Sequence, residues 1–400
     1  MTDSRSSARI GLACAGGVVE GAFYEIGVLC ALDEAIEGLD LNALHIYVGV
    51  SAGAIITACL ANGIPPRTIA RALASSDEAD FGLPPEKVFK PALGHYAERG
   101  WRVPATVLGS VRRRLRRPGD LSLFGALMEL AQSLPVGLFD NTPLERHLAR
   151  LFATEGHTND FRELPAMLRI IAVNLDTAEL VAFGDPATAH VPISRAVQAS
   201  TALPLLYCPV RIDGEYYIDG VARRTVNASR ALKEGVDLLL CVNPIVPIDL
   251  RVVGAKEHES LVDSGLPAVL SQTFRTVIHS RRIAGFRNYE YAHPEADVLI
   301  FEPEEGDPSM FFSSIFSFSN RHAVIEHGYA STRGHLLRHE ERLARVFRRH
   351  GLGLRGDVLR EPRTLVPDDR PGGTKTVLRE TGQVLDRLEA ALRRLGVDAA

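Results

Sequence analysis

The sequence has few cysteines, and their arrangement gives no basis for a disulfide framework or a cysteine metal site. The chain of 400 residues contains five, an odd number, and none belongs to a C-x-x-C pair. Most of them lie in apolar strand or helix patterns, which predicts reduced core side chains in a cytosolic protein. We expect neither a metal nor a cofactor. The five are Cys14, Cys30, Cys59, Cys208 and Cys241.

Long apolar runs and an excess of one charge sign are also missing. No apolar run reaches the ~18 residues that cross a membrane, and residues 1–7 are too polar for a signal peptide. The 45 basic and 49 acidic residues nearly cancel, which leaves a net charge of −4. This balance favours no nucleic-acid partner. We expect a cytoplasmic protein that contacts a membrane, if at all, only at its surface.

Alternating patterns at the start of the chain predict a parallel α/β sheet. Residues 9–15 are strand-like and 22–36 helical, and a second strand ends at Val50 before a helix over 52–60. Such a βαβα order is typical of parallel sheets. The later segments predict strands at 168–173, 179–183, 210–212, 216–218, 236–242 and 296–301, and helices at 67–74, 144–152, 194–201, 225–234, 266–286 and 323–343.

Composition predicts one large domain with additions. We expect a disordered start over 1–8, an α/β domain over 9–350, a linker rich in Gly, Pro and charge over 351–373, and a terminal helix over 374–400. Residues 77–137, with scattered prolines and the only tryptophan, predict a helical insertion. The terminal helix has an apolar stripe that needs a cover, either the main domain or a second copy of the chain. The oligomeric state therefore stays open, with a homo-oligomer through this helix as one outcome.

The strongest chemical signal is the pentapeptide GVSAG at residues 49–53. It matches G-x-S-x-G between a predicted strand and a predicted helix, where a sharp turn exposes a serine hydroxyl. Gly49 and Gly53 let neighbouring backbones pass Ser51 without Cβ clashes. The N–H group of Ala52 and the helix N-terminus can stabilise an oxyanion. The pentapeptide alone is equally typical of a tight turn in an α/β protein.

A second glycine-rich turn, Gly16–Gly21, follows the first strand and opens the first helix. Successive N–H groups in such a turn can face outward and bind an anion. The turn lacks the Lys-Ser/Thr ending of a P-loop, and its G-G-x-x-x-G spacing differs from that of dinucleotide sites. A nucleotide phosphate and a plain tight turn are the alternatives to an oxyanion loop.

The third signal is YIDGV at residues 217–221, where Asp219 ends a strand and a glycine follows. Alone, this pattern predicts an ordinary turn aspartate. Together and in this order, the three motifs resemble the patatin-like phospholipases, which are serine lipid acyl hydrolases. That family has a glycine-rich oxyanion loop, a G-x-S-x-G motif and a later D-G-G or D-G-A. The resemblance covers residues 9–243 and weakens beyond them, and the joint occurrence is more specific than any single motif.

The resemblance implies an α/β, patatin-like three-layer fold in which helices flank a mainly parallel central sheet, with a helical insertion. It implies hydrolysis of carboxylic esters of lipids without cofactor or metal. Ser51 would be the nucleophile and Asp219 the base in a Ser–Asp dyad that forms an acyl-enzyme. The N–H groups of the implied oxyanion hole belong to Gly16, Gly17, Val18 and Ala52.

The sequence departs from the family pattern at three positions. Val18 replaces a third glycine, Glu20 stands next to the place of the usual Arg or Lys, and Val221 follows Asp219-Gly220. A valine still supplies an N–H group, but the lost positive charge weakens the expectation of a phosphate-bearing headgroup. Two alternatives therefore stay open: a catalytically silent lipid-binding protein on the same fold, and a hydrolase of soluble short-chain esters or thioesters.

A Ser-Asp-His triad is the alternative to the dyad. Its histidine would follow the aspartate in the chain, as in α/β-hydrolases. None of the candidates lies at a predicted strand end, so the dyad is favoured. The candidates are His258, His279, His293, His322 and His327.

Two further segments carry lipid-binding hypotheses. The basic run 112–117 suits an anionic membrane surface, although such runs are usually solvated helix faces. The aromatic run 310–318 suits a lipid-contacting wall, although core packing is the commoner role of such side chains.

Overall fold

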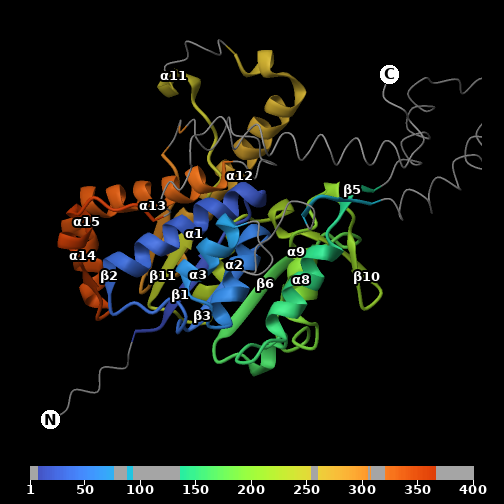
Figure 1. Ribbon diagram of the computed structural model, residues 1–400, viewed down its shortest axis with the longest axis horizontal. Coiled ribbons are helices and arrows are strands. Elements are labelled where there is room, and N and C mark those ends of the chain that lie inside the picture. Colours follow the sequence, from blue (N-terminus) through green and yellow to red (C-terminus); the bar gives the residue numbers. More distant parts are fainter. Residues whose placement is uncertain are drawn as a thin grey trace, which may run out of the picture. The chain divides into compact units, whose positions relative to one another are not determined.

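The computed structural model describes residues 8–75, 88–92, 136–253, 260–304, 307 and 320–365. Within these ranges the protein is built on an eight-stranded sheet (Figure 1). Its order is β12 (Asp297–Phe301), β11 (Leu238–Val242), β1 (Ile10–Cys14), β3 (Ile46–Val50), β6 (Met167–Asn174), β10 (Glu215–Asp219) and β9 (Val210–Ile212), with β7 (Leu180–Phe183) also paired to β6. The strands from β12 to β6 are parallel to one another, whereas β7, β9 and β10 pair antiparallel. This confirms the predicted α/β class and its mainly parallel sheet.

Helices cover both faces of this sheet because successive side chains of each strand point to opposite faces. Val48 and Val50 of β3 belong to a buried cluster with side chains of α10 (Ala228–Lys233) and α12 (Gly265–Ala292). Gly49 lies against Thr57 of α2 (Ala52–Ala61) on the other face. On that side α1 (Val18–Ala35) packs against α2, and α13 (Arg321–Arg338) lies along α1 (Figure 1). The predicted three-layer arrangement is present.

Helix α1 is buried almost all round, which explains why its sequence shows no polar face. Gly27 allows the close contact with α13, since a Cβ there would lie 2.1 Å from the carbonyl oxygen of Ile325. Three further helices confirm the predicted positions within a few residues. They are α3 (Pro66–Ala74), α8 (Thr142–Phe152) and α9 (Ile193–Ser200).

The segment after α13 differs from the prediction. The single helix expected over 323–343 is two helices, α13 and α14 (Glu340–Arg349). Part of the expected linker instead forms β13 (Gly353–Leu354), which pairs with β2 (Ile36–Glu37), and helix α15 (Gly356–Arg360). Arg333 of α13 fixes this segment by donating to the carbonyls of Val358 at 2.8 Å and Glu361 at 2.6 Å. Its order depends on distant partners, which local composition does not reveal.

The described ends of the expected insertion are strands rather than helices. β4 (Lys90–Pro91) and β8 (Leu205–Tyr207) pair with β5 (Gly137–Asp140) in a separate three-stranded sheet. Most of the insertion, including the basic run 112–117, lies outside the described residues, as do residues 310–318 and the terminal helix expected at 374–400. In the described ranges no helix is both long and apolar enough for a membrane span.

Candidate active site

Ser51 sits on a strained turn at the carboxyl end of β3. Its backbone has φ 52° and ψ −118°, and α2 begins at the next residue. A non-glycine residue in such a conformation costs on the order of 1–3 kcal/mol, which the surrounding contacts must offset. Gly53 allows those contacts, because a Cβ there would lie 2.6 Å from the carbonyl oxygen of Ala15. The N–H group of Gly53 instead donates to that oxygen at 3.1 Å.

Ser200 fixes the serine turn from the opposite side. The N–H group of Ser51 donates to Oγ of Ser200 at 2.8 Å, and the Ser200 hydroxyl donates to the carbonyl of Ile171 in β6 at 2.6 Å. Ser200 is fully buried at the end of α9. The role of Ser200 could not be predicted from the sequence, because its partners lie far away in the chain at Ser51 and Ile171.

The central sheet brings Asp219 beside the end of β3. Val50 pairs with Ile171 of β6, and Asp219, the last residue of β10, pairs with the next residue, Ala172. Because β7 occupies the other side of β6 at both positions, β3 and β10 lie on the same side and meet end to end. The side chain that follows β3 and the one that ends β10 are therefore neighbours.

Asp219 is a buried carboxyl without a cationic partner among the described residues. It is 1% exposed, and Ser51 is 6% exposed. The N–H group of Val221 donates to Oδ1 of Asp219 at 2.9 Å. Oδ2 of Asp219 accepts no hydrogen bond from any described residue. The Ser51 hydroxyl nevertheless lies near enough to lower the pKa of this carboxyl. Burial raises the pKa of Asp219 to about 7, against a smaller lowering by Ser51 and the Val221 N–H group.

The glycine-rich loop closes the site on the other side of Ser51. Ala15, just ahead of the loop, donates to the carbonyl of Val242 at 3.0 Å and so fixes the loop to β11. Gly16 must be a glycine, because a Cβ there would lie 2.1 Å from Val221 Cγ2 and 2.9 Å from Ser51 Cβ. The N–H groups of Gly16 and Gly17 make no hydrogen bond within the described ranges. The loop therefore presents free donors beside the serine.

The remaining loop positions have two notable features. Val18 adopts a positive φ of 56°, which is unfavourable for a β-branched residue and marks a conformation imposed by the fold. Glu20, in the first turn of α1, is 4% exposed. Burial raises the pKa of Glu20 to about 7, and Arg275 of α12 lowers it in part. The proximity of Glu20 and Arg275 could not be predicted from the sequence.

An apolar cavity opens at Ser51. Its wall consists mostly of aliphatic and aromatic side chains, which suit an acyl chain better than a charged group. Ser51 is its most reactive polar residue. The lining residues are Val18, Val19, Ala22, Phe23, Ser51, Ala52, Ile55, Leu73, Val88, Leu144, Thr201, Leu203, Leu206 and Tyr207.

The histidines considered for a triad have other partners. His322 bonds to the carbonyl of Ala74 at 3.0 Å, His327 to Asp307, and His293 lies 3.6 Å from Glu295. His279 contacts Arg282, and His258 lies outside the described residues. These partners of the four described histidines include neither Ser51 nor Asp219. In the described part of the chain no three His, Cys, Asp or Glu side chains gather as a metal site requires. All five cysteines are buried and outside any disulfide, as predicted.

Comparison with known families decides the classification. The model of the family described as "Patatin-like phospholipase" matches residues 12–232, more than half of the chain. The protein is a patatin-like phospholipase family member. The matched range contains all three motifs, so the resemblance seen in the sequence is confirmed. Membership supports hydrolysis of lipid esters in general terms.

Solved structures of this kind are distant in sequence. VipD from Legionella pneumophila is 15% identical, with 83% of this chain and 71% of that chain covered and a TM-score of 0.37. The type III effector ExoU, a Pseudomonas aeruginosa protein, is 16% identical with a TM-score of 0.35, and the match covers 84% of this chain but about half, 54%, of that chain. Human GIVD cytosolic phospholipase A2 is 14% identical, covered at 59% and 40%, with a TM-score of 0.24. No curated protein matches the sequence.

Proposed function

We propose that the protein hydrolyses carboxylic esters of lipids through Ser51 and Asp219, as a lipase or phospholipase A type enzyme. The observation that carries the proposal is the meeting of three features: a serine on a strained turn, a buried carboxyl without a cation, and an apolar cavity that Ser51 lines. Each feature has a structural role elsewhere in proteins. They meet at the carboxyl end of β3, in the parallel part of the sheet, and such a strand end is typical of an active site.

In the first step the Asp219 carboxylate takes the proton of the Ser51 hydroxyl while Oγ attacks the ester carbonyl. Burial makes this carboxyl more basic than an exposed aspartate, which suits a general base near neutral pH. The negative charge that develops on the carbonyl oxygen faces the N–H groups of Gly16, Gly17, Val18 and Ala52. Each such donor contributes roughly 3–4 kcal/mol to transition-state stabilisation in comparable sites.

The second half of the reaction restores the enzyme. Asp219 returns its proton to the departing alcohol, which leaves the acyl group on Ser51 Oγ. Water then attacks the acyl carbonyl as Asp219 takes one of its protons. The bond between the acyl carbon and Ser51 Oγ breaks, Asp219 returns the proton to that oxygen, and the carboxylic acid is released. The apolar wall beside Ser51 holds the acyl chain in both steps.

Glu20 bears on the substrate headgroup. The usual cation of related loops is missing here and the buried acidic Glu20 stands next to its place, so the glycine-rich loop offers no positive charge to a phosphate. We therefore expect the enzyme to select its lipid substrates mainly by their acyl chain and less by their headgroup. A soluble short-chain ester or thioester is the second candidate substrate, and a chain-length series with and without micelles separates the two.

The test is covalent labelling with a fluorophosphonate, followed by peptide mapping of the modified residue. We expect one modified residue, Ser51, and no labelling of the Ser51→Ala variant, which should unfold at the same denaturant concentration as the wild type. A folded wild-type protein that stays unlabelled would support a catalytically silent lipid-binding protein instead. Labelling at another serine would move the active site.

A further inference from the structure

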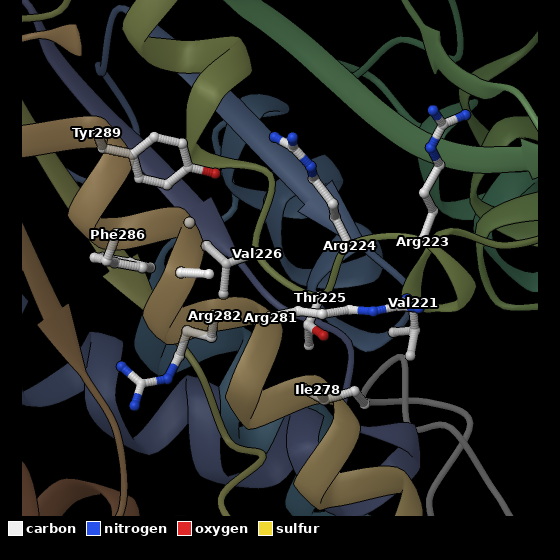
Figure 2. Close-up of a pocket in the computed structure, with 12 residues that line it drawn as sticks. Val221, Arg223, Arg224, Thr225, Val226, Ile278, Arg281, Arg282, Phe286 and Tyr289 are labelled. Carbon is white, nitrogen blue, oxygen red and sulfur yellow. The ribbon is translucent and has the colours of Figure 1, made fainter. Parts of the chain in front are cut away.

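A second cavity lies on the other side of the loop that follows Asp219. The loop passes from Asp219 through η4 (Gly220–Ala222) to Val226, and helix α12 forms the facing wall. The cavity has a volume of about 440 Å³, which is within the range of small-molecule sites. Figure 2 shows Arg223 and Arg224 on the loop and Arg281 and Arg282 on the helix.

The charge of this cavity is one-sided. Four arginines and no acidic residue line it: Arg223, Arg224, Arg281 and Arg282. Arg282 is neutralised by Glu302 at 3.2 Å. The other three donate only to neutral groups of the described chain.

Each of these three arginines has one neutral hydrogen-bond partner. Arg223 donates to the carbonyl of Ala178 at 2.7 Å, Arg224 to Oγ of Ser229 at 3.0 Å, and Arg281 to the carbonyl of Ala222 at 3.3 Å. Each guanidinium has five donors in a fixed fork, so one such bond leaves most of them unused. Uncompensated guanidinium groups at a cavity attract an anion.

The rest of the wall is mainly apolar, and its polar side-chain atoms are the hydroxyls of Thr225 and Tyr289. Ile278, Phe286 and Tyr289 of α12 face the loop, and Ile278 and Tyr289 are buried. In Figure 2 the Tyr289 hydroxyl points towards the side on which Arg224 lies. The cavity therefore combines cations with an apolar surface, which suits an organic anion better than a bare ion.

We propose that this cavity binds the phosphate group of an organic phosphate, with Arg223, Arg224 and Arg281 as its cationic partners. Guanidinium groups match phosphate oxygens in charge and in geometry. The apolar wall would contact the organic part of the ligand. The phosphate is borne either by a lipid headgroup or by a soluble metabolite. The assignment is independent of the proposed hydrolysis, because it concerns residues outside the Ser51 site.

The position of the cavity gives binding a physical link to the active site. Val221 lines the cavity, its N–H group bonds to Asp219, and its side chain faces Gly16. A ligand that fixes the loop at Arg223 and Arg224 would also fix Val221. The same short loop thus belongs to both sites.

The experiment measures binding in the Ser51→Ala protein, so that no ester is consumed. Calorimetric titrations use two probes, inorganic phosphate and monomeric dihexanoylphosphatidic acid. The test variant adds R223Q, R224Q and R281Q. The matched control adds R342Q, R345Q and R348Q on the exposed face of α14, with the same change of net charge.

We expect the affinity for at least one probe to fall about tenfold or more in the test variant, because charge-assisted hydrogen bonds are lost, and to change less than twofold in the control. Binding of the phosphatidic acid alone assigns a lipid headgroup, and equal binding of both probes assigns a soluble phosphate. No saturable binding of either probe, or equal losses in both variants, overturns the proposal. If the triple variant does not fold, R223Q and R224Q are tested singly by the same ratio.

Discussion

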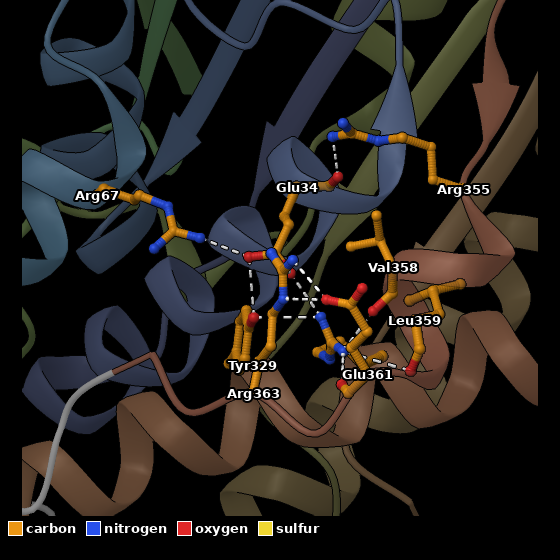
Figure 3. A network of polar contacts seen from close by, with 9 residues as sticks. Glu34, Arg67, Tyr329, Arg355, Val358, Leu359, Glu361 and Arg363 are labelled. Atoms are coloured by element: carbon orange, nitrogen blue, oxygen red, sulfur yellow. Dashed lines mark hydrogen bonds and ion pairs between the residues drawn. The ribbon is translucent and has the colours of Figure 1, made fainter.

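Two buried carboxylates of this protein have opposite surroundings. Glu34, near the end of α1, accepts hydrogen bonds from Arg333 at 2.6 Å, Arg67 at 2.5 Å and Tyr329 at 3.0 Å, and Arg363 lies 3.3 Å away (Figure 3). Asp219 accepts one from a backbone N–H group and has no cation beside it in the described ranges. The first carboxylate joins α1, α3, α13 and the segment around α15. The Asp219 carboxyl instead bonds to the N–H group of Val221 in the loop that directly follows it.

In the proposed mechanism this difference separates a structural carboxylate, Glu34, from a general base, Asp219. A carboxylate enclosed by guanidinium groups fixes the elements that supply them. Burial without a cation raises the pKa of Asp219 to about 7, which suits a general base near neutral pH. Burial alone is therefore no sign of catalysis, and the identity of the neighbours decides between the two roles.

The largest expected effect is that of Asp219→Asn on activity. The amide keeps the shape of the side chain but cannot accept the Ser51 proton, so kcat/KM for a soluble ester should fall by ~10²–10⁴. Steady-state kinetics measures this, with circular dichroism as the check on folding. An active Asn variant would remove the contrast between the two carboxylates.

The same variant has a stability signature with a defined sign. Because burial raises the folded-state pKa of Asp219 to about 7, its contribution to stability is greatest below the unfolded pKa of ~3.9 and is lost as the pH rises through 7. The Asn variant should therefore gain stability relative to wild type between pH 4 and 7. Urea unfolding at the two pH values measures the difference.

Arg333→Met should affect stability rather than chemistry. It removes a buried donor to Glu34 and the bonds to the carbonyls of Val358 and Glu361. Loss of one partner of a buried pair costs about 3–5 kcal/mol of unfolding free energy. Urea unfolding measures this, and kcat/KM at low temperature should stay within twofold. An unchanged unfolding free energy would contradict the structural role.

The smallest effects are expected for the described histidines outside the site. Single replacements of His279, His293, His322 or His327 by Asn should change kcat/KM less than about threefold, because the dyad needs no imidazole. Ester hydrolysis by the four folded variants measures this, with His258 replaced as a fifth. One variant as inactive as Ser51→Ala would indicate a triad.

Many elements of the fold and of the candidate site could be predicted from local sequence patterns. The serine turn, the glycine-rich loop and Asp219 each lie at a strand end that periodicity locates. The contact between the ends of β3 and β10 depends on their pairing with β6, which no local pattern specifies. Ser200, the pair Glu20 and Arg275, and the ordered segment around α15 likewise depend on partners far apart in the chain.

The central claim is that Asp219 is the base for Ser51, and the pH dependence of Ser51 acylation tests it most directly. The burst rate with a chromogenic ester should rise with pH to a plateau, with an apparent pKa of about 7 that matches the buried carboxyl. In Asp219→Asn the burst should be slower by orders of magnitude and should show no such titration. The same pH profile and a similar rate in Asp219→Asn would contradict the claim.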